Sequence, residues 1–373
     1  MLLRFSVSNY RGFRESIGID LTDKKNYQFG KECVRGDFLD KVIIVGANGA
    51  GKTNLGYAMV DIISTLTGYS RDIGQCDGEC FVNGNGDSDH ALFHYEFTYQ
   101  GTYITYEYGK RSPEEIVSEK LIIDRVIIFD YSVDDLAHGN YHLERVDAAK
   151  IDINTLDGKK ALLRRIIEET YQDRYSVIRA ISDFASHTLY YRAMWKKDEH
   201  IGIIDEDDDL DRFILGNGYI GELTAFLRDV GAVENEIVGV DGRLMIRTAH
   251  RDIPFDKAAS RGTMILCRLY CWIKRCIDKD ALIFFDDFDD MFHYRPAERA
   301  IRNIISSNRA ICIFVTHNTG LISNDFLRPD CCFILEDGRI SSLASRTDKD
   351  LRRGHNLEKM LREGEFDRPS EEE

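Results

Sequence analysis

The sequence lacks any long hydrophobic run. No apolar stretch in its 373 residues approaches the roughly 20 residues that a membrane-spanning helix needs. The opening stretch MLLRFSVSNYRGF alternates apolar and polar residues, as a strand does, and has no apolar centre typical of a signal peptide. We therefore expect a cytoplasmic protein with no membrane partner.

Positive charge is in short supply. The 49 lysines and arginines are outnumbered by 64 acidic residues, so the formal net charge is −15. This balance argues against nonspecific nucleic-acid binding by the whole surface, although a local basic groove that binds nucleic acid stays possible. The local candidates are Arg164, Arg165, Arg174 and Arg179, and a solvated helix face is the simpler interpretation of them.

The nine cysteines do not follow a disulfide or zinc pattern. Cys267, Cys271 and Cys276 lie inside an apolar helical stretch, which predicts core positions. Cys76 and Cys80 in CDGEC offer two metal ligands, but no second pair is placed to complete a set of four. We therefore expect no zinc site.

Residues typical of a second catalytic centre are also missing. The chain has no acidic run resembling a Toprim nuclease domain and no H-N-H arrangement. His138, His142 and His187 are scattered through the polar middle, where we interpret them as surface or structural residues. Any nuclease activity is therefore expected to come from another chain.

Strand and helix patterns alternate along the chain, without an internal repeat. Residues 92–110 alternate aromatic and polar side chains around Gln100-Gly101, which predicts an antiparallel hairpin, and 114–124 continue it as a meander. Helical spacing without glycine or proline extends over 159–195. The other expected elements are strands at 2–7, 17–21, 281–286, 310–315 and 332–336, and helices at 53–66, 219–231 and from 260.

The stretch GANGAGKT, from Gly46 to Thr53, fits the P-loop pattern G-x-x-x-x-G-K-[ST] without a mismatch. An apolar strand pattern precedes it and a helix pattern follows, as this motif requires. Gly46, Gly49 and Gly51 let the backbone curl so that its N–H groups face phosphate oxygens. The following helix directs its positive end at the same charge.

The polar residues of this motif predict ATP and Mg²⁺ as cofactors. Lys52 is expected to reach the β- and γ-phosphates, and Thr53 to supply a hydroxyl to Mg²⁺. Asn48 within the loop and Asn54 directly after it are included with the phosphate-binding residues.

A second buried strand, ALIFFDDFDD over 281–290, ends in four carboxylates. A P-loop site needs such an acidic strand end to hold Mg²⁺ through water, and Asp286 fits that role. Asp287 is then the candidate to orient the attacking water. Asp289 and Asp290 are interpreted as a solvated turn.

Two further stretches extend this phosphate-binding set. In ASRGTM, Ser260 and Gly262 stand at a helix start, where Ser260 can cap the helix and free N–H groups face an anion. In IFVTHNTGLI, His317 follows another apolar strand and can hydrogen bond a γ-phosphate. A plain N-cap and a structural histidine are the alternatives for the two stretches.

The order P-loop, S-x-G, acidic strand and strand-His resembles an ABC-type ATPase head of the SMC/RecF-like branch. LLRFSVSNYRGFRE resembles that branch's opening strand, in which an N-[FY]-[RK] turn lies beside the nucleotide base; Asn9, Tyr10 and Arg11 match it. The resemblance implies an α/β fold: a P-loop ATPase head with a mixed central sheet, an antiparallel β-subdomain and an inserted helical lobe.

A narrower resemblance is to the single-head ATP-binding proteins of prokaryotic, anti-phage defence operons, which are similar to the ATPase half of OLD nucleases. It is carried by IPFDKAASRGTMIL, FFDDFDDMFH and the tail SLASRTDKDLRRGHNLEKMLREGEFDRP. The similarity covers most of 1–60, 90–125 and 240–369. It implies a regulatory partner for a separately encoded effector, a nuclease or toxin.

The resemblance also assigns roles. Ser260 and Gly262 take the signature, which binds the γ-phosphate held by the other subunit, and His317 takes the switch-histidine role. Asp287 stands where the family usually has glutamate, and its shorter side chain puts turnover in question. The glutamine that usually contacts the γ-phosphate is not located, since Gln75 and Gln100 both fit poorly. The P-loop roles fall to Gly46, Gly51, Lys52 and Thr53, and the Mg²⁺ role to Asp286.

Four parts follow for the chain. They are an N-terminal ATPase lobe at 1–144, an inserted helical lobe at 145–235, a C-terminal ATPase lobe at 236–345 and a charged tail at 346–373, whose final SEEE we expect to be disordered. Because one P-loop and one S-x-G face opposite ways, we expect two heads to pair head-to-tail around ATP as a homodimer. Assembly of such dimers into a higher oligomer is the alternative.

Three functions compete. The first is a regulatory ATPase with slow hydrolysis that senses an invader and controls the effector. The second is a RecF-like DNA-repair clamp, which requires a basic groove that the net charge does not favour. The third, a transporter ATPase, fits poorly because no membrane segment exists, and long SMC arms are excluded because no sustained heptads span 145–235.

Overall fold

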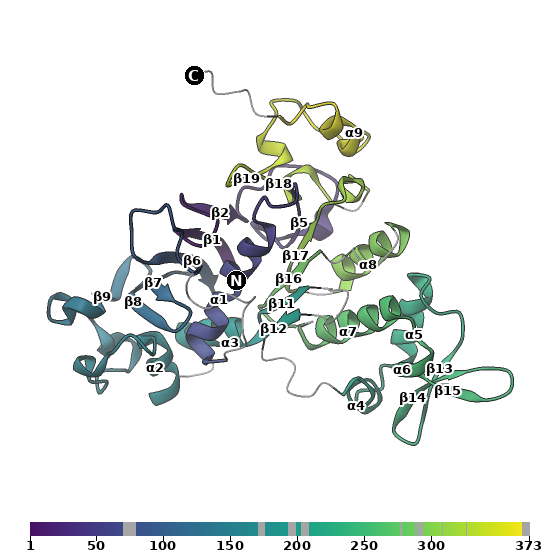
Figure 1. Ribbon diagram of the computed structural model, residues 1–373, viewed down its shortest axis with the longest axis horizontal. Helices are drawn as coiled ribbons and strands as arrows, with labels where there is room; N and C mark the ends of the chain where they lie inside the picture. Colours follow the sequence, from purple (N-terminus) through teal and green to yellow (C-terminus); the bar gives the residue numbers. More distant parts are fainter. Residues whose placement is uncertain are drawn as a thin grey trace.

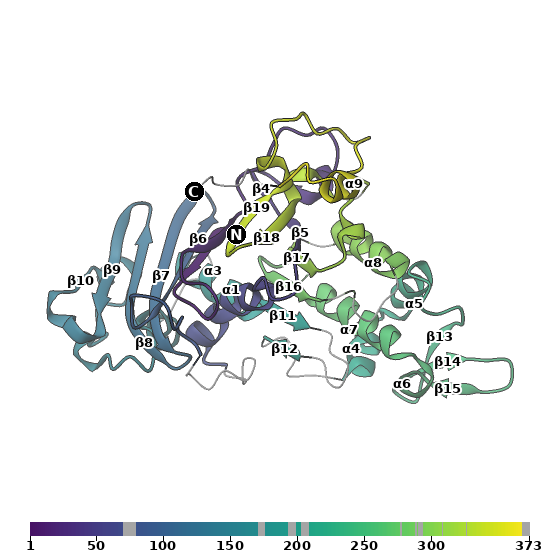
Figure 2. The ribbon, with the colours of Figure 1, turned by 45° about the horizontal axis from the view of Figure 1, so that its top comes forward.

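The computed structural model describes residues 1–69, 80–170, 176–192, 199–202, 209–276, 278–287, 289, 294–307, 309–325 and 327–367. Two seven-stranded sheets dominate it, one antiparallel and one largely parallel, and helix α1 (Lys52–Thr67) lies between them (Figure 1). A smaller lobe of helices and short strands extends from the far side of the parallel sheet (Figure 2).

The antiparallel sheet follows from alternating side chains. Phe93, Tyr95 and Phe97 are buried on one face of their strand, and the residues between them are partly exposed. Gln100 and Gly101 both have positive φ, as a tight hairpin turn requires. The strand order is β10-β9-β8-β7-β6-β1-β2. The strands are β1 Leu2–Ser8, β2 Ile17–Asp20, β6 Ala91–Tyr99, β7 Thr102–Ser112, β8 Glu115–Ile123, β9 Val126–Ser132 and β10 Asn140–Tyr141.

The central sheet has the order β12-β11-β16-β17-β5-β18-β19. Its five inner strands are parallel, and the outer strands β12 and β19 are antiparallel to their neighbours. The strands β5, β16 and β17 are buried at every residue, which explains their apolar runs. The strands are β5 Lys41–Val45, β11 Leu189–Arg192, β12 Glu199–Ile201, β16 Leu282–Asp286, β17 Ile311–Thr316, β18 Cys332–Glu336 and β19 Arg339–Ser342.

Helix α1 is buried on nearly all sides because a sheet covers it on each flank. Tyr95 of β6 donates its hydroxyl to the carbonyl of Ala58, at 3.0 Å. On the other flank, a Cβ at Gly56 would lie 2.5 Å from Phe284 of β16, so only glycine allows this approach.

A buried ion pair also joins α1 to the antiparallel sheet. Lys110 Nζ of β7 lies 3.0 Å from both carboxylate oxygens of Asp61, and the Tyr108 hydroxyl donates to the same carboxylate at 3.0 Å. The two charged side chains are 2% and 3% exposed. Such a pair must stay intact, because either charge alone would be buried without compensation.

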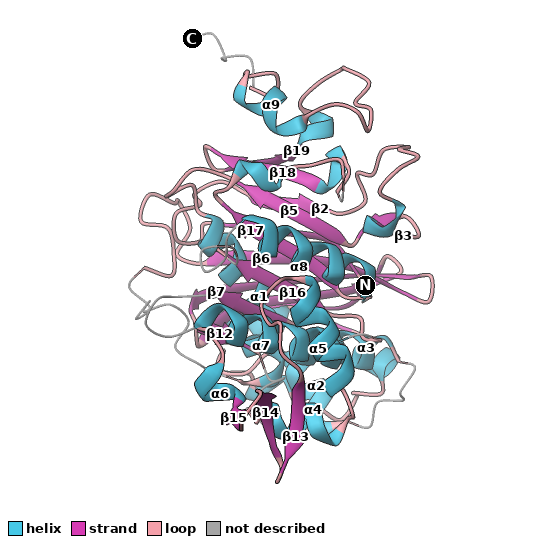
Figure 3. Cartoon of the chain, turned by 90° about the vertical axis from the view of Figure 1, so that its right-hand side faces the viewer, coloured by secondary structure: helices cyan, strands magenta, loops and turns pink. Residues whose placement is uncertain are grey.

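The opposite face of the central sheet is covered by α7 (Arg261–Cys276) and α8 (Tyr294–Ser307), which stand in front of it in Figure 3. Trp272 of α7 packs on the Tyr191 ring of β11 at a centroid distance of 4.6 Å. The smaller lobe packs on α7, where Tyr270 contacts the rings of Tyr219 and Phe226. That lobe comprises α4 Leu210–Gly216, α5 Ile220–Asp229, β13 Ile237–Val240, β14 Arg243–Arg247, β15 Asp252–Pro254 and α6 Phe255–Ala258.

The structure divides the stretch 145–235. The helical spacing is confirmed by α2 (Leu162–Glu169) and α3 (Val177–His187), which contact each other and α1. It is wrong for Leu189–Arg192, which forms β11 of the central sheet. Parallel pairing with β16 overrides the local helical pattern there.

The tail packs further than its charge indicates. Leu351, Leu357 and Phe366 are buried, and α9 (Leu357–Arg362) forms in this segment. The final SEEE lies outside the described residues. The remaining short elements are β3 Val34–Arg35, β4 Phe38–Leu39, η1 Lys31–Cys33, η2 Val133–His138, η3 Leu143–Val146, η4 Ile153–Thr155, η6 Thr319–Leu321, η7 Pro329–Cys331 and η8 Leu343–Ser345.

The cysteines of the described chain lie mostly in the core. Seven cysteines of the described chain are free, and all seven are buried. Cys80 is disulfide-bonded, so it is not a free thiolate ligand.

Among the helices that the structure describes, none is long and apolar enough to cross a membrane.

Candidate nucleotide-binding site

The P-loop joins β5 to α1 at the carboxyl edge of the central sheet. Gly49 and Gly51 have φ of 83° and 99°, values that side chains disfavour. A Cβ on Gly46 would lie 2.5 Å from the Leu335 carbonyl, and one on Gly51 would lie 2.7 Å from the Phe13 ring. Glycine is therefore required at these positions for conformation and for close packing.

Lys52 lies over the loop. Its Nζ donates to the carbonyls of Gly46 and Ala47, at 2.9 and 3.0 Å, and the residue is only 7% exposed. Its charge therefore lies beside the N–H groups at the start of α1, where anions are favoured. Asn48 is exposed on the loop and Asn54 is half-buried in the first turn of α1.

Thr53 and Asp286 meet, as the motifs predict. The Thr53 hydroxyl donates to Asp286 Oδ2 at 2.7 Å, and the Tyr190 hydroxyl donates to the same oxygen at 2.9 Å. Burial raises the pKa of the Asp286 carboxyl, and the hydrogen bond from Thr53 opposes this rise.

The same pair fits a magnesium ion. Asp286 Oδ1 is buried and has no hydrogen-bond partner among the described residues, which is costly for a carboxylate oxygen. Hydroxyl and carboxylate oxygens are ligands that Mg²⁺ favours, directly or through water. A cation held by Thr53 and Asp286 would satisfy the free oxygen and neutralise phosphate charge.

Asp287 turns away from regular strand geometry. Its φ is 45°, a left-handed conformation that is uncommon outside glycine. Arg192 Nη2 donates to its Oδ2 at 3.0 Å. The sequence motifs did not indicate Arg192. The apolar and aromatic run Leu189–Tyr191 directly before it is the signal that identifies a strand end there.

Asp289 is not part of a solvated turn, so that prediction is wrong. The residue is 7% exposed, and within the part of the chain that the structure describes its Oδ1 has no hydrogen-bond partner. Burial raises the pKa of its carboxyl, against hydrogen bonds from Thr316 and Asn318 and the nearby charge of His317. Asp289 therefore packs against the end of β17.

His317 lies at the same sheet edge as the P-loop. It directly follows Thr316, which pairs with Val45, the residue before Gly46. Its side chain is exposed at this edge. The topology thus brings together the P-loop, the end of β16 and His317.

Ser260 and Gly262 stand apart from this group. Ser260 Oγ accepts from the Thr263 amide at 3.1 Å, which confirms the helix cap. The Ser260 hydroxyl also lies 2.8 Å from the Thr263 hydroxyl. In Figures 1 and 2 the start of α7, next to α6, lies well away from α1. This chain's own P-loop and its S-x-G are therefore separate surfaces.

The opening N-Y-R turn packs against the P-loop helix. The Arg11 guanidinium lies 4.7 Å from the centre of the Tyr57 ring, and Tyr10 is buried beneath the turn. Asn9 and Arg11 both have positive φ. The Tyr57 hydroxyl donates to Glu199 at 2.8 Å. Arg11 is thus placed beside the first turns of α1.

The remaining residues considered from the sequence lie away from the P-loop or outside the described residues. Gln100 lies in the β6–β7 turn and donates to Tyr99. Among the arginines considered for a basic groove, Arg164, Arg165 and Arg179 each pair with an acidic residue four positions later. Their side chains are 26%, 15% and 54% exposed, so of these three only Arg179 lies on a well-solvated helix face. Gln75, Cys76, Arg174 and Asp290 lie outside the described residues.

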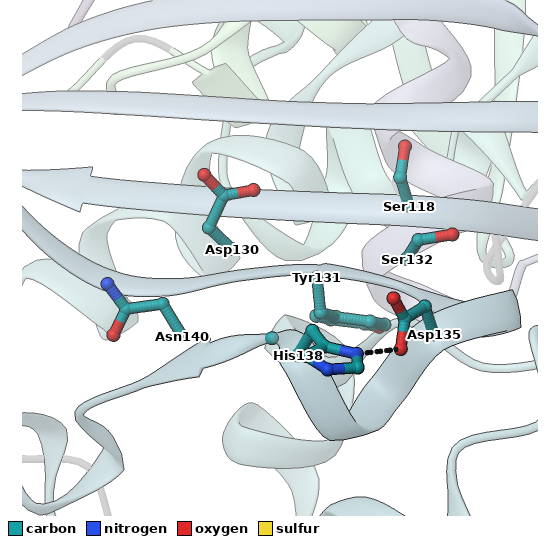
Figure 4. Close-up of a pocket in the computed structure, with 8 residues that line it drawn as sticks. Ser118, Asp130, Tyr131, Ser132, Asp135, His138 and Asn140 are labelled. Atoms are coloured by element: carbon teal, nitrogen blue, oxygen red, sulfur yellow. Dashed lines mark hydrogen bonds and ion pairs between the residues drawn. The ribbon is translucent and has the colours of Figure 1, made fainter.

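A hollow elsewhere on the surface is polar but lacks phosphate-binding features. It has a volume of about 440 Å³ and lies beside β9 and β10, at the outer edge of the antiparallel sheet (Figure 4). His138 Nδ1 lies 2.7 Å from Asp135 Oδ1 there, and Asp130 pairs with Lys120. His142 pairs with Glu144, and His187 bonds the Asp183 carbonyl.

The fold and the site define an α/β P-loop nucleotide-binding domain of the ATPase class. A family model described as "AAA domain, putative AbiEii toxin, Type IV TA system" matches residues 41–323. The chain belongs to this AAA family, whose P-loop sites use ATP and Mg²⁺. Similar solved structures include the SMC head domain from Thermotoga maritima, at 14% identity and a TM-score of 0.44, covering 91% of this chain and 97% of that chain. A comparison with curated proteins gave no match.

Proposed function

We propose that the protein binds ATP with Mg²⁺ and hydrolyses it slowly, as a regulatory ATPase. The observation that carries this proposal is the meeting of Thr53 with Asp286 beside Lys52, where Asp286 Oδ1 is buried and lacks a hydrogen-bond partner in the described parts of the chain. Lys52 would contact the β- and γ-phosphates, and the metal pair would hold the ion that bridges them. Arg11 lies where it can contact the nucleotide beyond the phosphates.

Hydrolysis would use Asp287 and His317. Asp287 follows the metal ligand directly and would orient the attacking water, and His317 would hydrogen bond the terminal phosphate. Asp287 is one methylene shorter than the glutamate more usual at such a strand end. A slow turnover is consistent with this shorter reach.

Phosphate release from ATP by the purified protein with Mg²⁺ tests this proposal. We expect slow release that depends on Mg²⁺ and is abolished in Lys52→Ala, because the lysine's charge is needed at the phosphates. Circular dichroism would confirm that the variant is folded. Equal release by both proteins would attribute the signal to a contaminant and contradict the proposal.

We further propose that two heads pair head-to-tail around two ATP molecules. The separation of Ser260 and Gly262 from the chain's own P-loop supports this, because α7 begins with N–H groups that a partner's γ-phosphate can meet. Interactions made only with ATP would then favour the closed dimer. Larger assemblies are compatible with the same contact.

Replacing Ser260 with arginine should abolish ATP-dependent association while leaving ATP binding unchanged. The large side chain would obstruct the helix start that receives the partner's phosphate. Sedimentation with and without ATP and Mg²⁺ measures the association, and Ser345→Arg offers a control at another serine. Dimerisation of the Ser260 variant at the wild-type ATP concentration would contradict the pairing.

The cellular role that we propose is that of the sensor or regulator of a prokaryotic defence system, acting on a separately encoded nuclease or toxin. The family description, which names a putative AbiEii toxin and a toxin–antitoxin system, supports this context. Co-purification with the product of the neighbouring gene, with and without ATP, tests it.

The alternative is a RecF-like clamp on DNA. Binding to duplex DNA with and without ATP, measured across salt concentrations, separates the two roles. Strong ATP-dependent binding would favour the clamp. The ion-paired arginines of α2 and α3 argue against it.

A further inference from the structure

Arg192 ends strand β11 beside the metal-binding strand. The two strands are parallel, and Arg192 is the register partner of Asp286. Tyr190, two residues earlier, stacks on Phe284 and donates to Asp286, so this face of β11 is turned towards α1. Arg192 and Tyr190 share a face because side chains alternate along a strand. The Arg192 guanidinium is therefore directed to the phosphate side of the sheet.

The guanidinium is held by the two acidic residues of this site. Its Nη2 lies 3.0 Å from Asp287 Oδ2, and its Nε lies 3.6 Å from Asp286 Oδ2. The Arg192 side chain is 31% exposed, and those of Asp286 and Asp287 are 0% and 16% exposed. The half-buried Arg192 thus offsets the negative charge of both carboxylates. Its shorter contact is with Asp287, the residue proposed to orient water.

Nucleotide would change this balance. A magnesium ion at Asp286 would take over the neutralisation of that carboxylate and bring a triphosphate beside the end of β16. Guanidinium groups bind phosphate and carboxylate with the same two-armed geometry. A terminal phosphate therefore competes with Asp287 for Arg192, whereas ADP has no group at that position.

We propose that Arg192 senses the terminal phosphate, by exchanging Asp287 for the γ-phosphate of ATP when the site is loaded. This inference depends on the proposed ATP binding. The exchange would release Asp287 to hold water only when a γ-phosphate is present. In the nucleotide-free protein the same ion pair keeps Asp287 occupied.

The test compares the affinities for two nucleotides. We expect Arg192→Ala to weaken binding of a non-hydrolysable ATP analogue with Mg²⁺ by about tenfold or more, and to leave ADP binding within about twofold. Arg192→Lys should recover part of the lost affinity, because lysine restores the positive charge but not the two-armed hydrogen bonding of a guanidinium. Arg179→Ala is the matched control, since this exposed arginine only pairs with Asp183 on α3. Isothermal titration measures all four proteins.

The outcomes separate this inference from the proposed function. Equal weakening of both nucleotides, or no weakening of either, would show a structural role for Arg192 and overturn the inference. Failure of the wild-type protein to bind any nucleotide would overturn ATP binding itself. If Arg192→Ala loses cooperative unfolding, Arg192→Gln allows the same comparison, because it keeps a donor for Asp287 but carries no charge.

Discussion

Replacing Asp287 with asparagine is expected to lower phosphate release from ATP by about 100-fold or more, while ATP still binds. Asparagine has the same shape, can accept a hydrogen bond from Arg192 through its amide oxygen, and tolerates the left-handed backbone at this position. What it loses is the negative charge that draws a proton from water. Turnover should therefore fall without loss of the fold.

Single-turnover phosphate release and ATP titration measure the two quantities separately. Asp147→Asn is the matched control, because Asp147 is an exposed aspartate with φ of 57° at the end of η3, remote from the P-loop. Turnover unchanged in Asp287→Asn would show that another group positions the water. Tight binding without turnover in the wild type would instead describe an ATP clamp.

Replacing Lys110 with methionine is expected to lower the free energy of unfolding by about 3–5 kcal/mol. Methionine fills similar space but leaves the Asp61 carboxylate buried without its cation. Two hydroxyls, from Tyr108 and Thr65, continue to donate to that carboxylate, and they do not replace a charge. The lost stability affects α1, whose first residues are Lys52 and Thr53 of the P-loop.

Urea unfolding followed by circular dichroism gives the free energy. Lys120→Met is the control from the neighbouring strand, because Lys120 pairs with Asp130 where both side chains are at least one-third exposed. Its expected cost is below about 1 kcal/mol. The double variant Lys110→Met with Asp61→Asn should regain part of the loss, and equal effects of Lys110→Met and Lys120→Met would contradict the argument.

The sequence motifs predicted the parts of the site that depend on local order. The P-loop needs its glycines and lysine in one short stretch, and Asp286 ends a run of apolar residues. The two motifs meet in the folded chain because each follows a strand of the parallel sheet, and parallel strands place their carboxyl ends at one edge. The meeting of Thr53 with Asp286 was therefore predictable from two separate stretches.

Arg192 and Asp289 were not predictable in this way. The surroundings of Arg192 have helical spacing that outweighs the short apolar run Leu189–Tyr191, and pairing with β12 and β16 makes this segment a strand. Asp289 lies in a run of acidic residues, a pattern typical of a solvent-exposed turn, but packing against Thr316 and Asn318 buries it. Both roles depend on contacts between strands that are distant in sequence, so local patterns do not contain them.

The seven buried free cysteines of the described residues have a practical consequence for the thermal unfolding of this protein. While the chain is folded, each thiol is shielded from oxidants and alkylating reagents. Global unfolding exposes all of them together, and in air the chain would then cross-link before it can refold. Heat inactivation should therefore be governed by the rate of unfolding, and reductant should make it reversible. The same thiols also report opening of the fold, so the rate of their alkylation, measured with and without ATP, tests whether ATP protects the folded state.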